Sequence, residues 1–126
     1  MTHLPFCVKR ANFYSSASLD TANPISFCGV TFANLISIIP GTVFETSITV
    51  HTTNRSLTIC KKLVTSLNIL SREGQEIELT DITLHILPDQ ADVTLGFDFI
   101  RNYCESVNVG EKYIVVSGGH VVSLTH

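Results

Sequence analysis

Short stretches of alternating apolar and polar residues, each ended by a turn, are the feature that most restricts the fold of this chain. In Val43–His51, Leu57–Leu63 and Glu76–Leu87 the alternation has a period of two, which is typical of a strand with one buried face. The polar segments 52–56 and 71–75 between them are turns by composition. The first two stretches therefore predict a hairpin with a polar tip.

The rest of the chain adds short strands and little helix. The apolar positions of Glu76–Leu87 shift by one residue near Thr80–Asp81, which predicts a β-bulge. Thr31–Ile39 combines helical spacing with β-branched residues, which fits a short helix or a strand, and we favour a helix or irregular structure there. Phe97–Cys104 is the best helix candidate. Further strands are expected over Phe6–Phe13, Ile25–Val30, Val64–Leu70, Val93–Gly96, Ser106–Val109, Lys112–Val116 and Val121–Leu124. We therefore predict a mostly β sandwich or closed barrel with one short C-terminal helix.

Length and composition limit the classes of function. A chain of 126 residues is the size of a single domain over 1–126, with a core over about 6–116. It is 44% hydrophobic and 15% charged, so we expect part of the apolar surface to be buried between subunits. The net charge of −3 argues against a nucleic-acid partner, which would require a basic face.

Cysteine and histidine spacing gives no sign of a metal or a cofactor. The cysteines Cys7, Cys28, Cys60 and Cys104 are widely scattered, which favours reduced and mostly buried thiols. The five histidines have no metal-ligand spacing. The first ten residues lack the apolar run of a secretion signal, and no stretch is long enough to span a membrane. We expect an intracellular, cytoplasmic protein with no metal, no cofactor and no membrane partner.

Two short segments carry a resemblance to a known family. The first, Leu19–Phe27, places Asp20 between an apolar approach and a polar turn, and the second, Val93–Ile100, contains Leu95-Gly96. Together they resemble the Asp-Thr/Ser-Gly turn and the apolar-Leu-Gly segment of retropepsins, the aspartic proteases of retroviruses and retrotransposons. Gly96 follows Asp20 by 76 residues, a separation that suits this family. The match is closest to retrotransposon-type members and to cellular domains derived from them.

The resemblance implies an aspartic endopeptidase. Hydrolysis by carboxylates needs two of them near one water, one ionised and one protonated. Among the aspartates only Asp20 has the motif context, so the second carboxylate would be Asp20 of another copy in a two-fold homodimer. By resemblance, Thr21 would brace the two loops, Ala22 would donate its backbone N–H, and Leu95 and Gly96 would support the site from behind.

The resemblance also implies a substrate and a dimer interface. The substrate would be an extended peptide or polyprotein segment. The flap that closes over it would consist of Thr52, Thr53, Asn54, Arg55 and Ser56. The family's dimers are tied by a sheet of interleaved termini, for which Phe6–Val8 and Val121–Leu124 are the candidates here.

The chain departs from the family pattern at two places. Ala22 stands where the family has glycine, and its methyl would crowd a peptide that approaches the backbone. The flap also lacks glycine, with Asn54-Arg55 in its place. Two alternatives therefore stay open: a retropepsin-like domain that dimerises or binds peptides without hydrolysis, and an unrelated β sandwich in which Asp20 is an Asx-turn residue.

Overall fold

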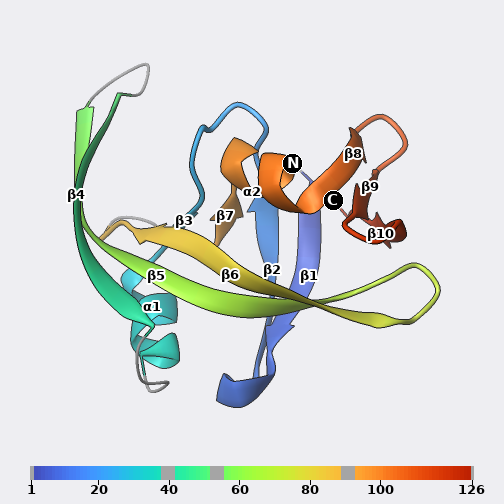
Figure 1. The fold of residues 1–126 in the computed structure, drawn as a ribbon, viewed down its shortest axis with the longest axis horizontal. Helices are drawn as coiled ribbons and strands as arrows, with labels where there is room; N and C mark the ends of the chain where they lie inside the picture. Colours follow the sequence, from blue (N-terminus) through green and yellow to red (C-terminus); the bar gives the residue numbers. More distant parts are fainter. Residues whose placement is uncertain (1, 38–41, 52–55, 89–92, 126) are drawn as a thin grey trace.

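The fold is mostly β, as predicted, and is seen in a computed structural model that describes residues 2–37, 42–51, 56–88 and 93–125. Within these ranges the strands form two sheets (Figure 1). The strands are β1 (His3–Val8), β2 (Phe13–Leu19), β3 (Phe27–Cys28), β4 (Val43–His51), β5 (Ser56–Leu70), β6 (Glu76–Ile86), β7 (Thr94–Leu95), β8 (Cys104–Asn108), β9 (Tyr113–Val116) and β10 (His120–Ser123). The helices are η1 (Lys9–Ala11), α1 (Val30–Ile36) and α2 (Phe97–Tyr103), η1 being a 3-10 turn.

The larger sheet closes on itself as a barrel. Its strand order is β1-β2-β7-β3-β6-β5-β4, and β1 also pairs with β5, so six strands form the ring while β4 extends from β5. The β1–β5 contact is short, with Phe6 opposite Ile69 and Cys7 opposite Asn68. The closed ring buries a common apolar core, to which β1, β2, β5, β6 and β7 all contribute side chains.

The long strands β4, β5 and β6 form a curved antiparallel ribbon (Figure 1). The predicted β4–β5 hairpin is confirmed, but β5 is one strand of 15 residues where the sequence predicted two. The β5–β6 register shifts where Thr80 and Asp81 stand between the pairs formed by Leu79 and Ile82. The predicted bulge is thus confirmed, and it gives Asp81 a left-handed backbone with φ of 58°.

Two of the predicted strands differ from those observed. The expected strand over Phe6–Phe13 is wrong, because the chain turns through η1 and Asn12 takes a left-handed conformation with φ of 50° that ends the turn. The expected strand over Ile25–Val30 is reduced to the two residues of β3, since Gly29 caps the following helix. Both differences occur where the chain must turn sharply beside the barrel.

The described residues contain two α-helices, α1 and α2, where the predicted fold has a single C-terminal helix. Phe97–Cys104 is confirmed as a helix, because α2 spans all but the last of these residues. The ambiguous segment Thr31–Ile39 contains α1, whose residues Phe32, Ala33 and Ile36 are buried against the barrel. That spacing of i, i+1 and i+4 is the apolar face of a helix, and it prevails over the β-branched content.

The smaller sheet has the strand order β10-β9-β8. These three strands correspond to those predicted over Ser106–Val109, Lys112–Val116 and Val121–Leu124. Ile114, Val116 and Val122 are buried in the same core as the barrel. A bridge between His3 and Thr125 joins the two ends of the described chain, which lie close together in Figure 1. No helix among the described residues is long and apolar enough to cross a membrane.

Candidate active site

Asp20 lies directly after β2, at a point fixed by parallel pairing. Ser18 and Leu19 of β2 are opposite Thr94 and Leu95 of β7, and the N–H of Asp20 donates to the carbonyl of Leu95 at 2.9 Å. Leu19 and Leu95 are both buried. The core therefore holds the backbone on either side of Asp20, while its half-buried side chain lies at the barrel rim.

The Asp20 carboxylate accepts hydrogen bonds from its own loop on both oxygens. The backbone N–H of Ala22 donates to Oδ1 at 3.0 Å. The side-chain amide of Asn23 donates to Oδ2 at 2.9 Å. Each carboxylate oxygen has two lone pairs, so each keeps one for a further donor such as water. The loop thus orients Asp20 and leaves it able to bind a ligand.

Gly96 packs against the back of this loop. A Cβ at Gly96 would lie 2.4 Å from the carbonyl oxygen of Ile25 and 2.7 Å from that of Asn23, both backbone atoms. The next residue, Phe97, donates its N–H to the same Asn23 oxygen at 2.7 Å. Only a residue without a side chain fits this contact, so position 96 and the Asp20 loop constrain each other.

A partly buried hydrogen-bond network behind the loop was not predicted from the sequence. Ser26 donates its hydroxyl to Asp98 Oδ1 at 2.6 Å and accepts a hydrogen bond from the N–H of Gly96 at 2.9 Å. The N–H groups of Ser26 and Phe99 also donate to the Asp98 carboxylate, at 3.2 and 2.7 Å. Asp98 and Ser26 together therefore join the residue before β3, Gly96 and the first turn of α2. The sequence signal was an acidic residue in the first turn of a helix, which gave no hint of Ser26.

The remaining predicted site residues lie around this centre. Thr21 and Ala22 are exposed. Ser56 is exposed at the start of β5 and its hydroxyl lies 2.9 Å from Nδ1 of His51. The other predicted flap residues, Thr52, Thr53, Asn54 and Arg55, lie outside the described residues. In Figure 1 the described ends of β4 and β5 rise on the same side of the molecule as the loop between β2 and β3.

The backbone of Ala22 does not need a glycine. The non-glycine residues with positive φ are Asn12, Asp81 and Lys112 in the part of the chain that the structure describes. Ala22 is therefore in a conformation that any L-residue adopts, and its methyl is exposed. The alanine therefore costs the single chain no backbone strain, and its exposed methyl is available for contact with a second molecule on this surface.

The segments predicted to interleave in a dimer pair within this chain. Phe6 and Val8 of β1 are buried in the core, as are Val122 and Leu124 at the C-terminal end. β10 pairs with β9, and the carbonyl of Val121 accepts the N–H of Arg72 from the β5–β6 turn at 2.7 Å.

Burial raises the pKa of three side chains, on β3, α2 and β8. It raises the pKa of the Cys28 thiol on β3 to about 12 and that of Cys104 to about 11. It also raises the pKa of the Tyr103 phenol on α2, with smaller contributions from the nearby acids. All four cysteines are free, but the expectation of mostly buried thiols is wrong, since Cys28 is buried and Cys60 is exposed.

Comparison with known families assigns the chain to one of them. A family model described as "Protein of unknown function (DUF3581)" matches residues 16–122. The chain belongs to this family. The span matched by DUF3581 begins within β2 and ends within β10, so it includes the whole Asp20 loop, Gly96 and Asp98. No curated protein matches the chain.

A solved structure of another protein has a similar fold. The retroviral protease-like domain of Ddi1 from Leishmania major superimposes with a TM-score of 0.65 at 16% sequence identity, and the match covers 100% of this chain and 95% of that one. The predicted retropepsin-like barrel is thereby confirmed as a fold. Among the described residues, no three side chains of the His, Cys, Asp or Glu type gather closely enough to hold a metal ion.

Proposed function

We propose that the chain is an aspartic endopeptidase of the retroelement type that works as a homodimer, with one Asp20 from each copy in a shared active site. The observation that carries the proposal is the Asp20 carboxylate itself, half-buried after β2 and oriented by Ala22 and Asn23. The retropepsin-like fold supports it, because the fold presents this carboxylate at the rim of the barrel.

The chemistry requires the second copy. One group must take a proton from the attacking water while another donates a hydrogen bond to the scissile carbonyl. Two carboxylates in contact cannot both ionise, so they share one proton and fill both roles. The free lone pair on each oxygen of Asp20 is where that proton and the water would bind. A two-fold axis beside the loop brings the pair together, with Thr21 as the bracing contact across it.

The substrate in this proposal is an extended peptide or a polyprotein segment. It lies over the two Asp20 loops and is covered by the hairpin tips of residues 52–56, which exclude water and offer backbone hydrogen bonds. Leu95 and Gly96 keep each loop in place from behind. The reaction consumes one water for each peptide bond cleaved, and the two carboxylates end the cycle sharing one proton as they began it.

A second candidate is a dimeric domain that binds peptides without cutting them. The methyl of Ala22 favours it, since this group is exposed beside Asp20 where the substrate backbone would lie. A peptide displaced outward by that methyl would have its carbonyl too far from the shared water, because reacting atoms must approach to about 3–3.5 Å.

Digestion of a mixed peptide pool, analysed by mass spectrometry, tests the proposal. Wild-type protein is compared with Asp20→Asn, Ala22→Gly and the surface control Glu111→Gln, each with folding checked by circular dichroism. Asp20→Asn should lower the rate about 10²–10⁴-fold, whereas Glu111→Gln should leave it unchanged. Added in excess, inactive Asp20→Asn protein should also suppress wild-type activity, because mixed dimers hold only one proper carboxylate.

The outcomes separate the two candidates. Cleavage that survives Asp20→Asn, or that is not suppressed by the inactive chain, contradicts the shared site. A wild-type dimer that retains peptides uncut, while Ala22→Gly cuts them, supports the peptide-binding domain. Sedimentation gives the assembly state directly, and a monomer at about millimolar concentration excludes both candidates.

A further inference from the structure

We infer that a second pocket, away from Asp20, binds small zwitterions, meaning molecules with one carboxylate and one ammonium group. The pocket has a volume of about 300 Å³ and lies where β1 turns away from β5. β1 pairs with β5 only through Phe6 and Cys7, and η1 then leads the chain back into β2. Within the described residues, the edge of β5 between its pairing with β4, which reaches Leu63, and its pairing with β1, which begins at Asn68, is therefore left without a paired strand. None of the residues 20–23 lines this pocket, so the inference is independent of the proposed protease.

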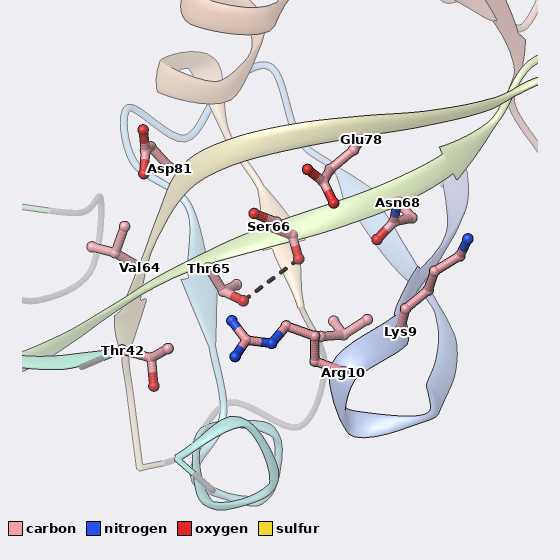
Figure 2. Close-up of a pocket in the computed structure, with 10 residues that line it drawn as sticks. Lys9, Arg10, Thr42, Val64, Thr65, Ser66, Asn68, Glu78 and Asp81 are labelled. Carbon is pink, nitrogen blue, oxygen red and sulfur yellow. Dashed lines mark hydrogen bonds between the residues drawn. The ribbon is translucent and has the colours of Figure 1, made fainter. Parts of the chain in front are cut away.

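One wall of the pocket carries an unpaired cation. Lys9 and Arg10 both line it, and Lys9 forms an ion pair with Glu76 at 2.5 Å. That hydrogen-bonded contact raises the pKa of Lys9. Arg10 has no ion pair or hydrogen bond with any residue in the described ranges. Figure 2 shows its side chain pointing into the pocket beside Thr65. A guanidinium in this position is suited to a planar carboxylate, which it binds through two parallel hydrogen bonds.

The opposite wall carries unpaired acids. Glu78 and Asp81 of β6 line the pocket, and neither side chain forms an ion pair within the described ranges. In Figure 2 they lie across β5 from Arg10. The backbone of Asp81 is held in place, since the Tyr103 hydroxyl lies 2.7 Å from the carbonyl oxygen of Thr80 and 2.8 Å from that of Asp81. This bifurcated contact holds the backbone of the bulge that carries Asp81.

These charges define the ligand class. A purely anionic ligand would be attracted to Arg10 but repelled by Glu78 and Asp81. A purely cationic ligand would be attracted to these two acids but repelled by Arg10. A molecule with charges of both signs matches both walls. The volume is at the lower end for ligand sites, which limits the ligand to about the size of an amino acid or dipeptide.

Titration followed by nuclear magnetic resonance tests this inference, with 4-aminobutyrate, 6-aminohexanoate and 8-aminooctanoate as probes of increasing charge separation. Hexanoate and hexylammonium serve as single-charge controls. At least one zwitterion should shift the amides of residues 9–10 and 64–68 saturably, with a millimolar Kd about fivefold below that of either control. Arg10→Gln and Glu78→Gln should each weaken it about fivefold, and Arg101→Gln, an exposed arginine outside the pocket, should not.

Three results would overturn the inference. The first is the absence of a saturable shift with every zwitterion up to about 20 mM. The second is hexanoate binding as tightly as the best zwitterion, which would mean that the acidic wall takes no part. The third is a Kd that Arg10→Gln and Glu78→Gln leave unchanged while the spectra show folded protein.

Discussion

Replacement of Asp98 by asparagine should destabilise the fold by about 2–3 kcal/mol, because this carboxylate accepts three hydrogen bonds that an amide cannot all accept. Oδ1 receives the Ser26 hydroxyl and the Phe99 N–H, and Oδ2 receives the Ser26 N–H. In the better orientation the amide oxygen replaces Oδ1, and its NH₂ group then faces the N–H of Ser26. Ser26 is 1% exposed, so its N–H has little access to bulk water once this acceptor is lost.

The magnitude follows from that one orphaned donor. A hydrogen bond to a charged group contributes about 1.5–3 kcal/mol, and a buried donor left without a partner costs a similar amount. With an unfolding entropy of about 2 cal/mol/K per residue, a loss of 2–3 kcal/mol lowers the Tm of a chain of 126 residues by roughly 10 °C. Thermal unfolding followed by circular dichroism measures this shift. Glu73→Gln, an exposed position, controls for the change in net charge.

A double-mutant cycle identifies the cause. Ser26→Ala removes the donor to Oδ1 and also the acceptor for the N–H of Gly96. If the network is the reason for the loss, the two changes should couple by about 1 kcal/mol or more. A Tm of Asp98→Asn within about 2 °C of wild type, or strictly additive effects, would refute the reasoning.

Three further changes test other parts of the fold. Gly96→Ala should destabilise by about 3 kcal/mol or prevent folding, because its Cβ would lie 2.4 Å from the Ile25 carbonyl oxygen; urea unfolding measures this, and a loss under about 1 kcal/mol contradicts the contact. Leu63→Ala at a fully buried position should cost about 2–5 kcal/mol in the same assay, and a smaller cost would mean a collapsible site. The raised pKa values of Cys28 and Cys104 mean that the folded state retains thiol protons that the unfolded state loses. Stability should therefore be complete below about pH 9 and fall as pH rises toward 11–12, and Cys28→Ser should reduce that fall.

The features that the sequence predicted best are those that depend on residues close together in the chain. The β4–β5 hairpin, the bulge at Thr80–Asp81 and the helix after Gly96 each follow from a local pattern of apolar spacing or turn residues. The Asp20 turn is local as well, since its hydrogen bonds come from residues two and three positions away. Such features are visible in sequence because the interacting residues lie within one turn or one strand pair.

What the sequence did not reveal depends on contacts between distant segments. Ser26 and Asp98 are 72 residues apart, and neither has a pattern that points to the other. Arg10 lies beside Thr65 only because β1 leaves β5 after two paired residues, which no local spacing indicates. The expected strand over Phe6–Phe13 was also wrong, because Asn12 takes a left-handed backbone that ends the η1 turn. Asparagine is depleted in strands and enriched in this conformation, so the sequence did contain a signal for the break.

Ala22 shows why the sequence pattern and the structure must be weighed together. From the pattern alone, alanine in place of glycine suggests a strained backbone, but the backbone at this position has no positive φ and the N–H still donates to Asp20. The glycine of the retropepsin pattern would therefore supply space here, and space is needed only when a second molecule covers the loop. A change to glycine should then cost the isolated chain a few tenths of a kcal/mol to about 1 kcal/mol through the unfolded state. Any gain would appear in peptide binding or cleavage, so the two effects have opposite signs and can be measured separately.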